Sequence, residues 1–163
     1  MRLGAGHDAV LMIERVREQD LSDLLPLMRG YCDFYEVAPS DAALLSLSCA
    51  LIHGVGAISH AEGIQLIARD EQTQAATGFA TVYWTWSTLH AARLAVMNDL
   101  FVEPAARGTG LADALIAACR EEAGTHGAAW LGWQTAKDNL RAQRVYERVG
   151  AERSEWIDYG LAP

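Results

Sequence analysis

The strongest signal in the sequence is the stretch LFVEPAARGTGLA at residues 100–112. It is typical of a strand end, a proline turn, a glycine loop and the start of a helix. Gly108 and Gly110 permit backbone conformations closed to other residues, so the free amides that begin the helix can point into one concavity. Such a concavity attracts phosphate oxygens, helped by the helix dipole and by Arg107. A simple turn between strand and helix is the alternative, because a short glycine motif is weak evidence by itself.

Two familiar phosphate-binding motifs do not fit this loop. A dinucleotide fingerprint that begins at Gly108 needs a third glycine where Asp113 stands, and it belongs near the start of a long alternating α/β chain. A P-loop needs a lysine followed by serine or threonine. The only lysine in the chain is Lys137, which precedes Asp138. The loop therefore belongs to neither class.

Length, composition and charge limit what surrounds the loop. The 163 residues correspond to one domain, and 51% hydrophobic with 21% charged residues suffice for a buried core. Thirteen Lys and Arg against 21 Asp and Glu give a net charge of −8, the wrong sign for following nucleic-acid phosphates. The apolar run at residues 10–13 is far shorter than the ~20 residues that span a bilayer. We therefore expect a cytoplasmic protein with neither a nucleic-acid nor a membrane partner.

Cysteine and histidine spacing favours neither a disulfide framework nor a metal site. The three cysteines are an odd number without a C-x-x-C pair, which favours reduced, buried thiols. The five histidines form no H-E-x-x-H pattern, so we expect no metal cofactor. These residues are Cys32, Cys49, Cys119, His7, His53, His60, His90 and His126.

The first third of the chain predicts one strand and two helices behind a loose leader at residues 1–9. The strand covers residues 10–16. A helix begins at residues 19–23 and frays near Gly30, and a second helix runs from residue 39 to about Gly54.

The rest of the chain predicts a mixed sheet in an α+β layer. Three strands at residues 63–69, 78–87 and 93–102 are expected to be antiparallel neighbours. The helix after the glycine loop then leads to a parallel strand at 129–134, which completes a βαβ unit. A last helix covers about residues 139–149.

That last helix carries a second motif, NLRAQRVYERVG, at residues 139–150. Asn139, Ala142 and Tyr146 are spaced i, i+3 and i+7, which places them on one helix face. Asn139 offers hydrogen-bond donors and acceptors to an amide-bearing ligand, Ala142 leaves room for close approach, and the phenol of Tyr146 can deliver a proton. The alternative is a packing helix in which Tyr146 is a half-buried aromatic.

Both motifs resemble those of the GNAT N-acetyltransferase superfamily, and the resemblance extends from about residue 10 to the end of the chain. RGTGLA at residues 107–112 is similar to the family's acetyl-CoA pyrophosphate loop, R/Q-x-x-G-x-G/A. Residues 139–150 resemble its last-helix pattern, N-x-x-A-x-x-x-Y-x-x-x-G. The resemblance implies one domain over residues 10–163, with a mostly antiparallel mixed sheet flanked by helices.

The resemblance also implies where acetyl-CoA binds and how it reacts. The strands at 93–102 and 129–134 would part, and the pantetheine arm would lie between them against free backbone groups. A neutral amine would attack the thioester while a strand amide stabilises the oxyanion and Tyr146 protonates the departing thiolate. The implied cofactor-binding residues are Leu100, Phe101, Val102, Arg107, Gly108, Thr109, Gly110, Leu111, Ala112, Asn139, Ala142 and Tyr146.

Because an alkyl amine is almost entirely protonated at neutral pH, a carboxylate or water chain must accept its proton. Asp99 is our candidate catalytic base, with Glu103 as its neighbour and Glu36 and Glu62 as more remote candidates. Strand alternation decides whether Asp99 faces the gap.

Within the superfamily, GFATVYWTW at residues 78–86 and NDLFV at 98–102 look closest to the spermidine/spermine and thialysine-type acetyltransferases. Asn98 departs from that pattern, because it stands where the subgroup has a glutamate base. An amide accepts no proton at neutral pH, so another base or water must serve.

Two groups of side chains each leave two alternatives open. Four tryptophans either line an acceptor pocket, with cation–π attraction to an ammonium group, or belong to the core. Three arginines of the last helix either reach the nucleotide 3′-phosphate or form a solvated face. The groups are Trp84, Trp86, Trp130 and Trp133, and Arg141, Arg144 and Arg148.

We therefore expect an acetyl-CoA-dependent N-acetyltransferase that acts on a primary amine of a small molecule, such as a polyamine, a diamine or an amino-acid-like amine. The net charge of −8 would concentrate a cationic amine near the surface. The alternatives are a non-catalytic acyl-CoA sensor of the same fold and a protein N-acetyltransferase. The resemblance also implies a homodimer.

Overall fold

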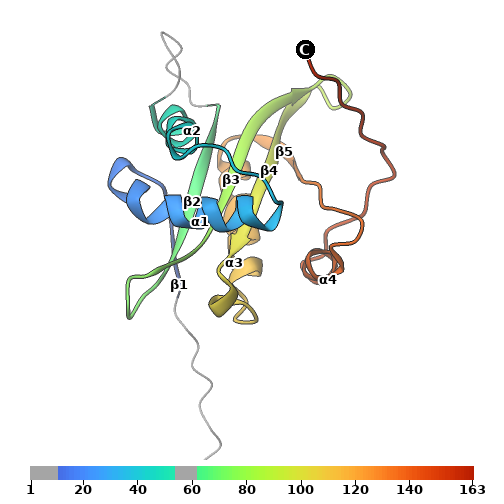
Figure 1. Cartoon of the computed structure of the whole chain (residues 1–163). Coiled ribbons are helices and arrows are strands. Elements are labelled where there is room, and N and C mark those ends of the chain that lie inside the picture. The colour runs from blue at the N-terminus through green and yellow to red at the C-terminus, as the bar shows by residue number, and fades with distance from the viewer. Residues whose placement is uncertain (1–10, 54–61) are drawn as a thin grey trace, which may run out of the picture.

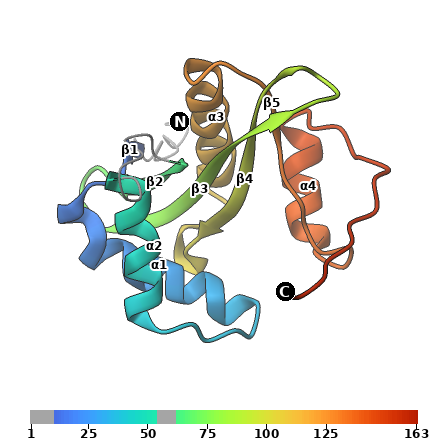
Figure 2. The same ribbon diagram turned by 90° about the horizontal axis from the view of Figure 1, so that it is seen from above.

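The computed structural model describes residues 11–53 and 62–163 (Figure 1). The leader predicted at residues 1–9 lies outside these ranges, as do His7, His60 and the helix end predicted at Gly54. In the described part, a five-stranded sheet is covered by α1 and α2 on one face and by α3 on the other, while α4 lies beyond the sheet edge (Figure 2).

The sheet has the strand order β1-β2-β3-β4-β5. Its first four strands are antiparallel neighbours, and β5 is parallel to β4, which confirms the predicted mixed sheet and βαβ unit. The strands are β1 (Leu11–Arg15), β2 (Gly63–Asp70), β3 (Ala76–Ser87), β4 (Ala92–Val102) and β5 (Ala128–Gly132).

Helix α1 (Leu21–Phe34) continues four residues past Gly30, so the fraying predicted there is wrong. Gly30 is a packing residue instead, because a Cβ atom at this position would lie 2.6 Å from Cζ of Phe101 on β4. The missing side chain lets the helix lie close to the sheet. Helix α2 (Asp41–His53) follows it.

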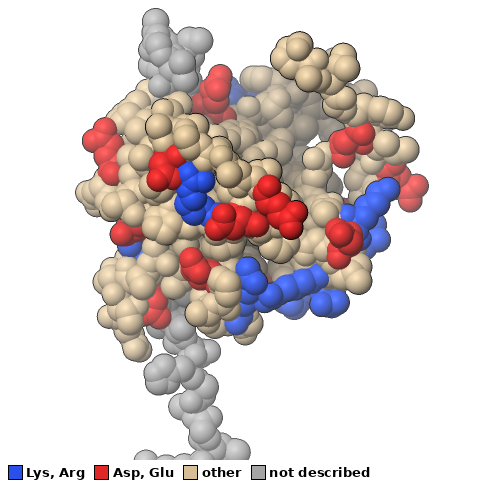
Figure 3. All heavy atoms as spheres, viewed as in Figure 1, with Lys and Arg blue, Asp and Glu red and all other residues tan. Residues whose placement is uncertain are grey.

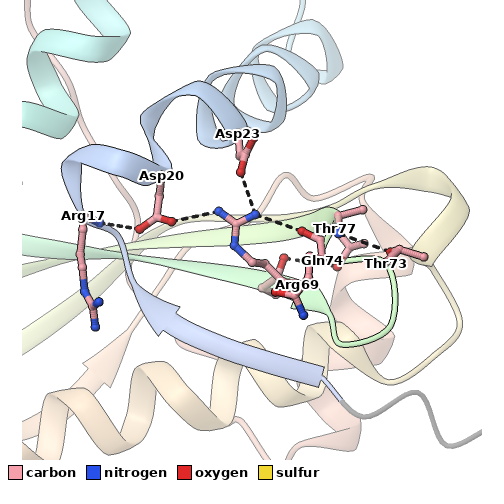
Figure 4. Close-up of polar contacts among 9 residues, drawn as sticks. Arg17, Asp20, Asp23, Arg69, Thr73, Gln74 and Thr77 are labelled. Carbon is pink, nitrogen blue, oxygen red and sulfur yellow. Dashed lines mark hydrogen bonds and ion pairs between the residues drawn. The ribbon is translucent and has the colours of Figure 1, made fainter.

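An arginine on β2 fixes the start of α1 against the sheet (Figure 4). Arg69 donates to Asp20 (Nη2 to Oδ1, 2.9 Å) and pairs with Asp23 (Nη1 to Oδ2, 2.8 Å). The side chains of Arg69 and Asp20 are only 14% and 11% exposed, so this pair is shielded from solvent. The short 3-10 turn Glu18–Asp20 thereby gives α1 a defined starting point.

Each face of the sheet has its own hydrophobic core. Helix α3 (Leu111–Thr125) packs Leu111, Leu115 and Cys119 against one face. Helix α1 packs Leu24 and Leu27 against the other, together with Phe79 and Phe101. Helix α4 (Leu140–Arg148) has no fully buried residue, but Val145 and Tyr146 pack against the core on the α3 side. No helix among the described residues is long and apolar enough to span a membrane.

Candidate functional site

Strands β4 and β5 part from one another along the sheet. Their pairing runs from Arg93, opposite Ala128, to Val96, opposite Gly132. Beyond Val96, the edge of β4 that faces away from β3 pairs with no strand of residues 11–53 or 62–163, as the resemblance implied. The parting leaves a cleft of about 620 Å³ between β4, the start of α3, α4 and the end of α1.

This cleft brings nearly all predicted cofactor-binding residues together. The residues of β4, the glycine loop and α4 that were predicted to bind acetyl-CoA line it, except Thr109. The hydroxyl of Thr109 instead donates to the Ala106 carbonyl oxygen at 2.7 Å and so closes the loop. Phe101 contributes to the cleft, but its side chain is buried in the core beneath α1.

The glycine loop has the backbone geometry that its sequence predicted. Gly108 and Gly110 have φ angles of +82° and +86°, in the left-handed region that favours glycine. Gly110 is the N-cap of α3, and no side chain caps this helix. The first intrahelical bond is from Ala114 N to Gly110 O. The amides before Ala114 are therefore available to an anion.

Arginines dominate the charge of the cleft. Arg107, Arg141, Arg144 and Arg148 all line it, and Asp113 is its one acidic lining residue. Arg148 pairs with Asp113 at 2.6 Å and holds the pKa of that carboxyl below its ordinary value. Figure 3 shows basic side chains gathered beside α4 and the start of α3, and acidic ones over α1. The arginines of α4 thus face the cleft as well as solvent.

Arg107 also acts within the protein. Its Nε donates to the carbonyl oxygen of Val102 at 3.0 Å. One carbonyl at the end of β4 is therefore already bonded, which sequence reasoning did not anticipate. The bond holds the arginine beside the glycine loop.

Helix α4 presents Asn139, Ala142 and Tyr146 to the cleft. The Asn139 side-chain oxygen accepts a hydrogen bond from Ala142 N at 3.2 Å and caps the helix, so its acceptor is already used. Tyr146 packs edge-on against Trp133, with 5.3 Å between ring centroids, and its hydroxyl bonds to Thr135. Burial raises the pKa of Tyr146, so the phenol stays protonated.

Asp99 does not line the cleft. A β-bulge places Thr81 opposite Asp99 and Val82 opposite Met97, which leaves Asn98 as the extra residue. Asp99 therefore lies under α1, where Asn98 Nδ2 donates to its carboxylate at 3.0 Å and the hydroxyls of Thr81 and Tyr31 also lower its pKa. Burial raises the pKa of Asp99 despite these bonds.

The other candidate bases are not gathered with Asp99. Glu103 and Glu62 line neither this cleft nor its neighbour. Glu36 lines a second cavity of about 480 Å³ between the end of α1 and the start of α4. This cavity shares Phe34, Tyr35, Asn139 and Arg141 with the first, so the two adjoin.

Sequence reasoning missed three aromatic residues at the C-terminal end of α1, where Tyr35 is the C-cap. Tyr31, Phe34 and Tyr35 line the cleft, but they follow the point where the helix was predicted to fray. Their i, i+3 and i+4 spacing is the signal that identifies them once the helix is extended past Gly30.

The tryptophans line neither cavity. Trp84 stacks on His126, with 4.1 Å between centroids, and packs against the core with Trp133. Trp86 and Trp130 are 67% and 56% exposed. The four tryptophans therefore neither line an acceptor pocket nor all belong to the core.

Comparison with known proteins agrees with this geometry. The Acetyltransferase (GNAT) family profile matches residues 27–151. An uncharacterized N-acetyltransferase, YhfO of Bacillus subtilis (strain 168), is 34% identical over 86% of this chain and 89% of its own. The thialysine N-epsilon-acetyltransferase of Bos taurus is 24% identical over 88% and 85%.

Solved structures share the fold. The crystal structure of a probable acetyltransferase superposes with a TM-score of 0.80 at 25% identity, over 93% of this chain and 97% of its own. Aminoglycoside N-acetyltransferase AAC(6')-Iy in complex with CoA gives a TM-score of 0.77 at 20% identity over 99% of both chains. With the family profile covering most of the chain, this protein belongs to the GNAT family and is an acetyltransferase.

Proposed function

We propose that this chain transfers the acetyl group of acetyl-CoA to a primary amine of a small molecule in a ternary complex. The observation that carries the proposal is the cleft where the free edge of β4, the glycine loop and Tyr146 of α4 meet. A second cavity adjoins it and offers separate room for an acceptor.

The cleft suits acetyl-CoA in charge and in shape. Its four arginines and the uncapped start of α3 complement phosphate groups, while the edge of β4 offers backbone groups to a pantetheine arm. The structural relative AAC(6')-Iy was solved with CoA. In this proposal Asn139 acts mainly by capping α4, because its side-chain oxygen already bonds Ala142.

The acceptor cavity suits a cationic amine. Glu36 and Asp138 supply negative charge that outweighs the single Arg141 of the lining. Phe34 and Tyr35 supply aromatic faces that attract an ammonium group. Several relatives act on amines by their names, among them the thialysine enzyme. Asn98 stands where polyamine-type enzymes carry a glutamate, so the base must be another group.

In the reaction, the amine nitrogen attacks the thioester carbonyl, the C–N bond forms and the C–S bond breaks. A backbone amide of β4 near Leu100 stabilises the oxyanion. One such donor typically stabilises the transition state by about 2.7–4 kcal/mol. Tyr146 protonates the departing thiolate, and its raised pKa means that the phenol carries the required proton at neutral pH. Asp99 is the final acceptor of the amine proton.

A thiol-release assay with a panel of mono-, di- and polyamines tests this function. Wild-type protein should acetylate at least one amine, and Tyr146→Phe should lower kcat by about 10²–10⁴-fold with an unchanged Kd for acetyl-CoA. Tight acetyl-CoA binding without turnover on any amine would instead support the sensor, and turnover only on protein N-termini would support the protein acetyltransferase.

Titration calorimetry with acetyl-CoA tests the cofactor site separately. Gly110→Asp adds a negative charge where the phosphates are proposed to lie and should raise the Kd at least tenfold, about 1.4 kcal/mol. Gly127→Asp is the matched control, because Gly127 also has a positive φ of +76° but lines neither cavity. Equal affinities of the two variants would refute the phosphate loop.

A further inference from the structure

A line of hydrogen-bonded polar side chains crosses the sheet beneath α1. Gln65 of β2 lies opposite Thr81 of β3, and Thr81 lies opposite Asp99 of β4. The Gln65 Nε2 atom donates to Thr81 Oγ1 at 3.2 Å, and the Thr81 hydroxyl, opposite Asp99 in the sheet, lowers the pKa of that carboxylate. Gln65 and Thr81 are 4% and 0% exposed, so no solvent competes for these bonds.

The bond from Gln65 fixes the direction of the Thr81 hydroxyl. A hydroxyl has one proton, and because its oxygen already accepts from Gln65, that proton is directed to Asp99. The arrangement leaves the other amide atom, Gln65 Oε1, buried without a hydrogen-bond partner among the described residues. An orphaned buried carbonyl weakens a fold, so packing alone gives no reason for glutamine here.

Tyr31 of α1 connects this line to the cleft. Its hydroxyl donates to the Asn98 carbonyl oxygen at 3.4 Å, and it lies close enough to the Asp99 carboxylate to lower the pKa of that group. Tyr31 lines the cleft, whereas Gln65, Thr81 and Asp99 do not. Tyr31 is therefore the residue that both lines the cleft and lies beside Asp99.

We propose that Tyr31 relays the proton of the acceptor amine to Asp99, and that Gln65 and Thr81 are positioning residues that aim this carboxylate at Tyr31. The inference rests on the proposed N-acetyltransferase function. One N–H bond of the ammonium group breaks and its proton goes to the Tyr31 oxygen, while the phenolic proton of Tyr31 goes to Asp99. Tyr31 ends neutral, Asp99 ends protonated, and the nitrogen lone pair is free to attack.

The surroundings of the relay favour proton transfer in this direction. The titratable groups that face Asp99 are Tyr31 of α1 and Tyr83 of β3, while Tyr35 of α1 and Tyr146 of α4 face Tyr31. Among the described residues, no lysine or arginine contributes to the pKa shift of Asp99. Burial raises the pKa of Asp99, which makes it a stronger base than a surface carboxylate.

The first test is the pH dependence of kcat/KM on an amine that the wild type acetylates. Tyr31→Phe should lower kcat/KM about 10²-fold or more, because the phenol is the link to the base. Thr81→Val removes a donor from the Asp99 carboxylate, so its pKa rises and the acidic limb of the profile moves to higher pH. Thr81→Ser keeps the hydroxyl and should restore the wild-type profile. A merely structural role for Thr81 would lower activity without moving the limb.

Gln65→Met separates positioning from folding. The variant removes the orphaned carbonyl, so its resistance to urea should equal or exceed that of the wild type. The acidic limb should shift in the same direction as in Thr81→Val but less far, because the Thr81 hydroxyl is still present. Its Kd for acetyl-CoA should stay within twofold, since Gln65 is away from the cleft. The positioning role would be overturned if Gln65→Met is less stable than the wild type and the acidic limb of its kcat/KM profile does not move.

The failures of the two proposals can be told apart. Turnover by wild type with kcat/KM unchanged in Tyr31→Phe would overturn the relay alone, and no turnover on any amine would overturn the proposed function and the relay together. The positioning role has a readout independent of turnover, the ¹³C carboxyl titration of Asp99, assigned with Asp99→Asn. The pKa of Asp99 should rise in Thr81→Val, and an unchanged titration would overturn that role.

Discussion

The surroundings of a single carboxyl group, Asp99, connect the chemistry of this protein to its stability. Burial disfavours the charged form, and three donors only partly offset this effect. The folded-state pKa therefore lies above the unfolded one, and the folded protein binds this proton more readily. The contribution of protonated Asp99 to the free energy of unfolding is complete below the pKa of this group in the unfolded chain. It is lost as the pH rises through the pKa of the group in the folded protein.

Asp99→Asn tests this sign, because asparagine keeps the side-chain shape but never ionises. We expect the stability of the variant relative to wild type to increase from pH 4 to pH 8, since only the wild type must then bury a charge. Urea unfolding at both pH values measures the difference. Asp70 and Asp113, whose pKa values are lowered, are common to both proteins and cancel. A relative stability that falls with pH would contradict the expectation.

At the same scale, the sequence predicted the residues whose placement is local. Tyr146 and Ala142 meet the cleft because helical spacing alone puts them on one face, and Gly108 and Gly110 have the positive φ that their loop needed. The position of Tyr31 depends on how far α1 extends and on what it packs against, so no local pattern identified it.

At the scale of the elements, the order and type of every described strand and α-helix could be predicted, because periodicity and turn residues record them locally. Two features depended on contacts distant in sequence. The length of α1 follows from the fit of Gly30 against Phe101. The face of the sheet on which Asp99 lies depends on a β-bulge, which the alternation of side chains along a strand does not predict.

Gly30→Ala measures how closely α1 and β4 are fitted. Alanine favours a helix by about 0.5–1 kcal/mol over glycine, but its Cβ would lie 2.6 Å from the Phe101 ring. We expect a net loss of about 1–3 kcal/mol in the free energy of unfolding, as for an overpacked core. Gly124→Ala in α3 is the control, because its Cβ meets nothing within 4 Å and should stabilise by about 0.4–1 kcal/mol. Equal changes in the free energy of unfolding of the two variants would show that the contact between Gly30 and Phe101 is not tightly packed.

At the scale of the whole molecule, charges of the two signs are unevenly distributed over the surface seen in Figure 3. The arginines of the cleft lie beside α3 and α4, while acids gather over α1 (Figure 3). A net charge of −8 and an anionic cosubstrate are thus compatible, because each proposed substrate meets the charge opposite to its own. Composition predicts the overall sign, but only the fold shows where each sign lies.

The homodimer remains a prediction at this scale. Near the C-terminus, Trp156, Ile157, Tyr159 and Leu161 are 75–98% exposed, more than a monomer needs to leave in water. We expect sedimentation equilibrium to give twice the chain mass, and replacement of Trp156 and Tyr159 by serine to weaken the association. A wild type that sediments as a monomer at all concentrations would contradict the prediction. The domain bounds at residues 10 and 163 likewise stay a prediction.

The extra residue of the β4 bulge, Asn98, is connected with two features of the site, the gap between β4 and β5 and the position of Asp99. Pairing between β4 and β5 ends at Val96, just before the bulge, and the bulge is also what turns Asp99 towards α1. A bulged strand bends. Deletion of Asn98 would leave Thr81 and Asp99 opposite each other. Without the bulge, β4 would run straighter towards β5, and the gap between the two strands would be narrower. One extra residue in β4 thus acts as a spacer between the gap proposed for the thioester and the acid that lies under α1.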